Sequence, residues 1–573
     1  MCGIAGIVSR QQLNYEDLKA HEKLLERRGP DDINSLFFEK NNINFYFLHS
    51  RLSIQDTSSR SAQPFSPSYS SNILVYNGEI YNHELLFPKE SVFSDTHALF
   101  KICDSNIKFL NLLDGFFAFC FYNSNDNILY IGRDQFGVKP LFYYSSDAVF
   151  AYSSSLRHLS KIVNANIKVT KKCLLQSAYL GYTHEYSTVY ENISKVPPNT
   201  LLKINLPCFT IKSSSIYKPF THNQSINRSP KNYLFYKDLI ANALQESVKL
   251  QLSNSQRGSS VFLSGGVDSA LIAALSSLQS RESDRYVQSF SVISSSIDVD
   301  ESKRINQVLK YSSFSRISSS QFLFEDFNII SVLNMFANLD YPVLDISLLP
   351  TLFLCSMIPR DIRVCLSGDG ADELFIGYSR VWDSLNRFRF FRSIPLCSEL
   401  SSPRLEKYKI AKSPLELRLL FSGVPINYLS ECLPSIHGNN HLSELLNYEL
   451  FYYLPSVLEK VDSASMLHGI EVRVPFLSTN IANIVSQIPL NVLSNPRNPK
   501  YILKDILSSF TDQKYPFDSK KGFNLSPILY DLFIRSLNEF NYPELYPNEL
   551  HLITSKVSLL RLLMLKHWIF NKT

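Results

Sequence analysis

The pattern of apolar residues changes character once along the chain, and this change constrains the fold more than any other feature. Over the first 200 residues, short apolar runs alternate with turn residues, which is typical of antiparallel strands. From about residue 233, strand-like runs alternate with longer helical patterns, which indicates a parallel sheet. We therefore predict an α+β sandwich of two antiparallel sheets, followed by an α/β doubly wound domain that is mainly helical beyond about residue 380.

A polar segment with two prolines, residues 213–231, separates the two patterns and has the composition of an exposed linker. We place the domains at 2–205 and 236–573, with a linker over 206–235. Apolar residues make up 45% of the chain and charged residues 19%, which excludes a disordered chain.

Charge and cysteine content exclude several classes of protein. A net charge of +5 over 573 residues gives no basic surface for nucleic acid. No apolar run approaches the roughly 18 residues of a membrane helix, and the N-terminus lacks the pattern of a signal peptide. The nine cysteines are dispersed without a CxxC pair, which argues against a disulfide framework. We therefore expect a cytoplasmic protein that binds neither nucleic acid nor membrane.

The residue after the initiator methionine is a cysteine. Removal of Met1 leaves Cys2 with a free α-amine, and the ordinary pKa of such an amine, about 7.7–8.0, lets part of it accept a proton near neutral pH. One residue can then supply both nucleophile and base, as in N-terminal threonine hydrolases. Taken alone, a small residue at position 2 more often has no catalytic role.

Further segments place Cys2 in a larger pattern. They are Cys2-Gly3-Ile4, Arg28-Gly29-Pro30-Asp31, Arg51-Leu52-Ser53-Ile54, Asn77-Gly78-Glu79-Ile80-Tyr81-Asn82, Ser94-Asp95-Thr96, Leu113-Asp114-Gly115 and Gly132-Arg133-Asp134. This ordered set resembles the class II glutamine amidotransferases, whose N-terminal residue is the nucleophile.

The resemblance implies that Cys2 attacks the glutamine amide and that Asn77 and Gly78 stabilise the resulting oxyanion. Arg51 would hold the α-carboxylate of glutamine, and Asp95 with the region of Glu79 its α-amine. The implied glutamine-binding set is Arg51, Leu52, Ser53, Ile54, Asn77, Gly78, Glu79 and Asp95.

A glycine-rich turn opens the second domain. Ser264-Gly265-Gly266-Val267-Asp268-Ser269 follows a strand-like run and precedes a helical pattern. Glycines let the backbone approach phosphate closely, and a helix N-terminus offers free N–H groups to an anion. The segment resembles the pyrophosphate loop of N-type ATP pyrophosphatases, and the chain has no Walker-type loop. Chemistry at the α-phosphate of ATP is therefore favoured.

An acidic loop, Ser367-Gly368-Asp369-Gly370-Ala371-Asp372-Glu373, follows another strand-like run. Clustered carboxylates at a strand end need a cation or must stay solvated. We expect Asp268 and Asp372 to lie on neighbouring strand ends and to share Mg²⁺ with diphosphate. A solvated acidic loop is the alternative.

Together, the two loops resemble those of the glutamine-hydrolysing asparagine synthetases. Three further segments carry the same resemblance, namely Leu454–Met466, Glu471–Leu477 and Lys500–Lys504. The resemblance implies that Asp369 and Lys500 act at an acyl-adenylate, that ATP and Mg²⁺ are required, and that a homodimer is compatible with the sequence. The implied ATP-binding residues are Leu263, Ser264, Gly265, Gly266, Asp268, Ser269, Val292, Ser367 and Gly368.

The favoured reaction amidates L-aspartate with nitrogen from glutamine and yields asparagine, glutamate, AMP and diphosphate. The same chemistry on another carboxylate, such as a uronic acid, is the close alternative, and a non-catalytic regulatory paralogue is a third. Asp369 stands where many members have glutamate, and Ser155 and Ser478 stand where acidic residues are common. These departures leave the acceptor open.

Overall fold

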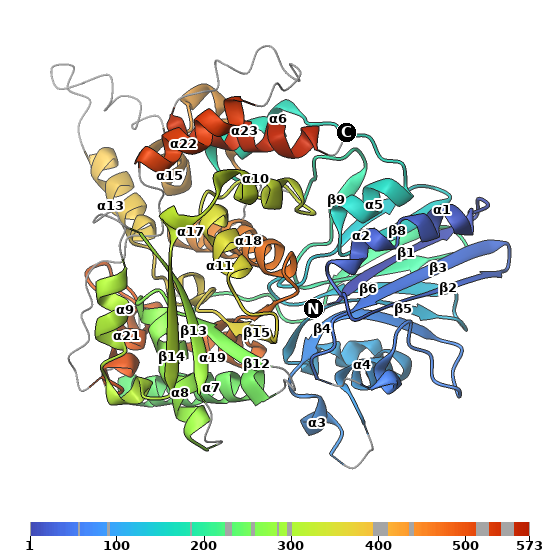
Figure 1. Ribbon diagram of the computed structural model, residues 1–573, viewed down its shortest axis with the longest axis horizontal. Coiled ribbons are helices and arrows are strands. Elements are labelled where there is room, and N and C mark those ends of the chain that lie inside the picture. The colour runs from blue at the N-terminus through green and yellow to red at the C-terminus, as the bar shows by residue number, and fades with distance from the viewer. Residues whose placement is uncertain are drawn as a thin grey trace.

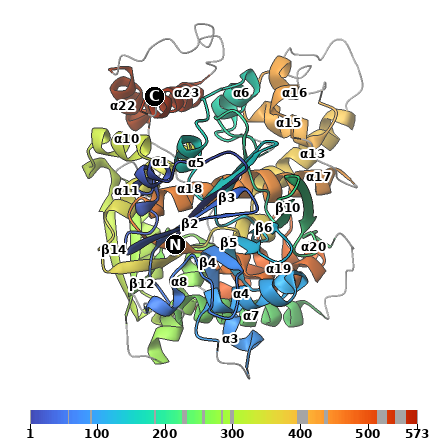
Figure 2. The same ribbon diagram turned by 90° about the vertical axis from the view of Figure 1, so that its right-hand side faces the viewer.

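The computed structural model describes residues 2–55, 58–88, 92–183, 186–223, 232–253, 258–282, 286–294, 301–393, 411–434, 440–511, 527–539 and 555–571. Figures 1 and 2 show a sheet-rich N-terminal part, in blue to cyan, beside a larger part built on a separate sheet. Within the described part of the chain, no helix has the length and apolar content needed to cross a membrane.

Two antiparallel sheets form the N-terminal part, as predicted. The first consists, in spatial order, of β2 (Asp32–Lys40), β3 (Ile43–Arg51), β1 (Gly3–Ser9), β8 (Val149–Ser153), β7 (Phe142–Ser145) and β9 (Ile193–Lys195). The second consists of β11 (Thr210–Ser215), β10 (Thr200–Asn205), β6 (Ile128–Arg133), β5 (Gly115–Asn123) and β4 (Ile73–Ile80). Apolar side chains of both sheets share one core, in which Phe45 and Phe47 of β3 contact Tyr122 of β5. The sandwich is thus held by the apolar faces of its two sheets.

Short helices flank this sandwich. They are α1 (Tyr15–Ala20), α2 (Lys23–Glu26), α3 (His83–Leu86), α4 (Asp95–Ser105) and α5 (Leu156–Ile162). Helix α6 (Lys171–Tyr179) instead packs against α16 (Leu429–Cys432) and α23 (Lys556–Phe570) of the second part (Figure 1). Strand β11 lies inside the segment 206–235 that the sequence assigns to the linker, because its backbone pairs with β10 although its side chains are mostly exposed. Residues 224–231 of that segment lie outside the described residues, and α7 (Tyr233–Ser253) follows.

A parallel sheet forms the second part. Its spatial order is β14 (Ile317–Leu323), β13 (Val287–Ile293), β12 (Gly258–Phe262), β15 (Ile362–Leu366) and β16 (Glu471–Arg473). Alternate residues of β15 face opposite layers: Val364 joins the core that contains α8 (Val267–Glu282), whereas Cys365 joins the core that contains α11 (Leu348–Ser356) and α18 (Leu454–Met466). The predicted doubly wound architecture is confirmed. The strand order reverses between β12 and β15, and ligands bind at such a point in open α/β sheets.

Beyond residue 380 the described chain is mainly helical, as predicted. Its helices are α13 (Ser379–Ser393), α15 (Pro414–Phe421), α16 (Leu429–Cys432), α17 (His441–Tyr448), α18, α19 (Thr479–Gln487), α20 (Leu490–Leu493), α21 (Tyr501–Ser508), α22 (Pro527–Asn538) and α23 (Lys556–Phe570). The earlier helices of this part are α9 (Ser302–Val308), α10 (Ile329–Ala337) and α12 (Ala371–Leu374). The exception is β16, whose three residues are all buried. Three residues are too few for a period of two to be recognised, so the sequence pattern could not reveal this strand.

Candidate active sites

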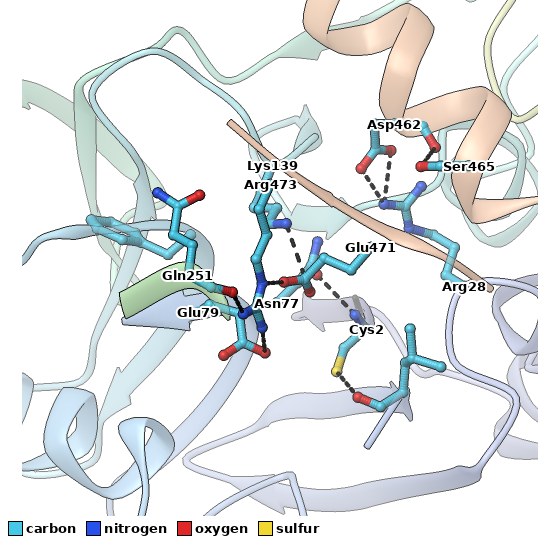
Figure 3. A network of polar contacts seen from close by, with 12 residues as sticks. Cys2, Arg28, Asn77, Glu79, Lys139, Gln251, Asp462, Ser465, Glu471 and Arg473 are labelled. Carbon is cyan, nitrogen blue, oxygen red and sulfur yellow. Dashed lines mark hydrogen bonds and ion pairs between the residues drawn. The ribbon is translucent and has the colours of Figure 1, made fainter. Parts of the chain in front are cut away.

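Cys2 lies at the start of β1, where it meets β4 and the end of β3 (Figure 3). Its backbone N–H donates a hydrogen bond to Asn77 Oδ1 at 3.0 Å, and its Sγ lies 3.9 Å from the carbonyl oxygen of Leu52. Burial raises the pKa of the Cys2 thiol, so the resting thiol is protonated and a base has to remove its proton before attack.

The Asn77 side chain presents a donor beside this thiol. Asn77 is fully buried, and its Nδ2 has no hydrogen-bond partner among the described residues. A buried amide N–H without a partner is costly unless a ligand accepts from it. The group is thus placed where an oxyanion formed next to Cys2 could accept a hydrogen bond.

Close packing against the neighbouring strand requires a glycine at position 78, whatever role its N–H has toward substrate. A Cβ at this position would lie 2.1 Å from the carbonyl oxygen of Phe116 on the neighbouring strand. We expect Gly78→Ala to destabilise the protein by about 3 kcal/mol and to lower Tm by roughly 6–12 °C, measured by thermal unfolding. The matched control is Gly258→Ala on β12, where the nearest atom is 3.4 Å away. An equal Tm for the two variants would contradict this account.

The remaining glutamine-binding candidates lie around the same strands. The Asp31 carboxylate accepts a hydrogen bond from Ser53 N–H, and Asp31 N–H donates to the Arg51 carbonyl, so the two motifs that contain these residues pack together. Asp95 begins α4 and accepts a hydrogen bond from the Tyr76 hydroxyl at 2.9 Å. The buried residues of the set are Arg51, Leu52, Ile54, Asn77, Glu79 and Asp95.

Lys500 joins the two loops of the second part. Its Nζ lies 2.9 and 2.8 Å from the two carboxylate oxygens of Asp268 and 2.6 Å from Asp372 Oδ1. Burial alone would lower the pKa of this amine, but the two carboxylates outweigh it and raise the pKa. Gly377 makes room for the arrangement, because a Cβ there would lie 1.9 Å from Asp372 Oδ1. Lys500 itself adopts a left-handed backbone conformation, with φ of 54°.

The two loops also contact each other directly. A Cβ on Gly368 would lie 2.9 Å from both Asp268 Cβ and Ser269 N. Ser269 Oγ accepts a hydrogen bond from Ser264 N–H, which fixes the turn before α8. Ser367 Oγ donates to Asp369 Oδ2 at 2.6 Å.

The other nucleotide-binding candidates lie on the adjoining strand ends. Leu263 follows β12 and donates its N–H to the Phe290 carbonyl of β13, the strand that also carries Val292. The predicted ATP site therefore gathers at the switch point of the sheet.

Comparison with known proteins agrees with both halves of this arrangement. The asparagine synthase family model matches residues 239–562, and the glutamine amidotransferase domain model matches residues 1–213. The chain belongs to the asparagine synthase family. It is therefore an ATP-dependent carbon–nitrogen ligase that takes its amido nitrogen from glutamine.

Two Bacillus subtilis proteins show how far the similarity extends. Asparagine synthetase (glutamine-hydrolyzing) 1 is 26% identical over 576 residues, covering 91% of this chain and 87% of the relative. Asparagine synthetase (glutamine-hydrolyzing) 3 is 24% identical over 563 residues, with the same coverages of 91% and 87%. Similarity to the asparagine synthetases thus spans both domains.

Two departures from the asparagine synthetase pattern lie between the domains. Ser155 Oγ donates to Asp340 Oδ1 at 2.7 Å, and Ser478 Oγ donates to Asp114 Oδ2 at 2.9 Å. Each serine thus meets an aspartate of the other half of the chain, where an acidic side chain would instead face a like charge. Both serines thus contribute to contacts between the two halves of the chain.

A buried charged cluster next to Cys2 is formed by Glu79, Lys139, Glu471 and Arg473 (Figure 3), and of these residues sequence reasoning assigned a site role to Glu79 alone. Arg473 Nε donates to Glu471 Oε1 at 2.7 Å, and Lys139 Nζ lies 3.9 Å from Glu471 Oε2. The family resemblance marked the segment of Glu471 and Arg473, but no signal in it shows that these charges face the glutaminase half.

Proposed function

We propose that this enzyme converts L-aspartate, L-glutamine and ATP to L-asparagine, L-glutamate, AMP and diphosphate. The observation that carries the ATP chemistry is the position of Lys500, whose ammonium bridges the aspartates of the two loops that meet at the switch point. The choice of aspartate as acceptor rests on the similarity to proteins named asparagine synthetases. A fixed positive charge there can stabilise a pentavalent phosphorus centre and the departing diphosphate.

The glutaminase half would supply the nitrogen. Cys2 would attack the glutamine amide after its α-amine takes up the thiol proton, with Asn77 and Gly78 as oxyanion donors and Arg51 and Asp95 on the α-substituents of glutamine. Asn77 Nδ2, which has no hydrogen-bond partner among the described residues, supports this assignment. Ammonia released at Cys2 would then displace AMP from the acyl-adenylate near Asp369 and Lys500.

Asp268 and Asp372 fit Mg²⁺ by the chemistry of their donors. Proteins hold this ion through one or two carboxylates together with phosphate oxygens and water. In the part of the chain that the structure describes, no three His, Cys, Asp or Glu side chains gather into a complete metal site. The phosphates of ATP would complete the shell, and the ion, when bound, neutralises charge on diphosphate.

One observation, the side chain of Asp369, supports a second class of acceptor substrate. It is one methylene shorter than the glutamate common at this position, so it reaches less far toward the acceptor. A larger carboxylate, such as a uronic acid, is therefore the alternative substrate.

The test measures AMP and diphosphate release with glutamine and ATP, supplying aspartate, glutamate, malate or a uronic acid in turn. Release that depends on aspartate supports the proposal. Release that depends on the uronic acid supports the alternative acceptor. If none of the carboxylates stimulates release, both proposed acceptors are wrong.

A further inference from the structure

Arg473 lies between the two active sites, and its side chain faces the glutaminase half. It is fully buried, and its guanidinium contacts Glu471 Oε1 at 2.7 Å and Glu79 Oε1 at 3.6 Å (Figure 3). Its Nη1 also donates to the carbonyl of Gln251. Glu79 lies two residues from Asn77 on β4, so both side chains face the same side of the strand.

The backbone of Arg473 faces the synthetase site. In the sheet, Arg473 pairs with Leu366, and its carbonyl accepts the N–H of Ser367 at 2.8 Å. Ser367 in turn donates its hydroxyl to the carboxylate of Asp369. One residue therefore connects the Glu79 carboxylate to the loop that carries Asp369.

The contact between Arg473 and Glu79, at 3.6 Å, is the longest of the contacts that connect the two sites. Glu79 Oε2 is buried with no hydrogen-bond partner among the described residues, as is Asn77 Nδ2. Burial raises the pKa of Glu79, and a cationic neighbour opposes that shift. A ligand that brings an ammonium group toward Glu79 therefore competes with Arg473 for the same carboxylate.

We propose that Arg473 is a positioning residue that couples occupancy of the glutamine pocket to the placement of the Asp369 loop. The inference rests on the proposed roles of Glu79 and Asp369. Because β16 is buried and hydrogen-bonded on β15, a shift of the guanidinium is transmitted to the backbone that holds Ser367. Coupling of this kind is reciprocal, so ATP must change the affinity for glutamine by the same factor as glutamine changes the affinity for ATP.

The test uses the full chain carrying Cys2→Ala, which binds glutamine without hydrolysing it. Calorimetry measures the Kd for glutamine with and without saturating α,β-methylene-ATP. We expect the analogue to change this Kd about fivefold or more, within the usual range of allosteric coupling. Adding Arg473→Lys should reduce the change to less than about 1.5-fold while both ligands still bind.

The matched control is Lys195→Arg, which alters a buried interdomain pair, Lys195 with Glu459 at 2.8 Å, away from the Asp369 loop. It should keep the full change in Kd. If Arg473→Lys does not fold, Glu471→Gln removes the carboxylate that Arg473 Nε contacts at 2.7 Å and should abolish the change instead. The proposal is overturned if the Cys2→Ala chain shows no change in Kd, if Arg473→Lys and Glu471→Gln preserve the change, or if Lys195→Arg loses it too. These binding measurements need no acceptor, so they fail independently of the aspartate assignment.

Discussion

Cys2→Ala is expected to lower glutamine-dependent amidation about 1,000-fold or more while amidation with ammonium stays within about twofold. The thiol lies 3.9 Å from the Leu52 carbonyl on the glutaminase side of the molecule, near Asn77, whose Nδ2 has no hydrogen-bond partner within the described part of the chain. Its loss therefore removes the nitrogen supply without touching the loops that bind ATP. The measurement is AMP release with either nitrogen source at saturating ATP and acceptor.

The control for this variant is Cys208→Ser, at an exposed cysteine outside both sites. It should retain both activities. Loss of the ammonium-dependent rate in Cys2→Ala would show that Cys2 has a structural role in the synthetase half. A normal glutamine-dependent rate would mean that another residue is the nucleophile.

Lys500→Met is expected to lower AMP release about 1,000-fold with either glutamine or ammonium, whereas glutamine hydrolysis persists. The substitution keeps an unbranched side chain of similar length but removes the charge shared by Asp268 and Asp372. Both carboxylates are then left close together without their cation, and binding of the triphosphate meets their repulsion. Glutamate formation and AMP formation, measured in the same samples, separate the two half-reactions.

Lys504→Met provides the comparison, because Lys504 lies one turn further along α21 and hydrogen-bonds to Asn498 instead of the aspartates. Its AMP release should stay within about threefold of the parent chain. If both variants lose AMP release equally, the rate depends on the total positive charge near the site and not on the bridge that Lys500 forms between the aspartates.

Sequence analysis found the two loops of the synthetase half most directly, because the residues that contact one another in each loop are also close together in the sequence. Ser264 and Ser269 form one turn, and Ser367 and Asp369 another, so the turn chemistry that marks them in the sequence is what holds them in the structure. The meeting of these two turns also followed from the sequence, because a doubly wound strand order brings the ends of β12 and β15 together.

The contacts that escaped prediction join segments hundreds of residues apart. Arg473, on the three-residue strand β16, forms an ion pair with Glu79. Ser155 donates a hydrogen bond to Asp340 across the two parts of the chain. Such contacts depend on how the two parts of the chain pack against each other. A single sequence has no periodicity that encodes that docking, so the charges at the interface could be seen only in the structure.

The backbone of Lys500 has a consequence for how this enzyme can be engineered. A residue with a side chain at φ of 54° pays roughly 1 kcal/mol in conformational strain that glycine would avoid. Lys500→Gly would relieve that strain, but it would also leave Asp268 and Asp372 close together without their cation, which destabilises the protein by more than the strain that is relieved. At this position stability and turnover depend on the same ammonium group, so a library of glycine substitutions at residues with positive φ should leave Lys500 unchanged.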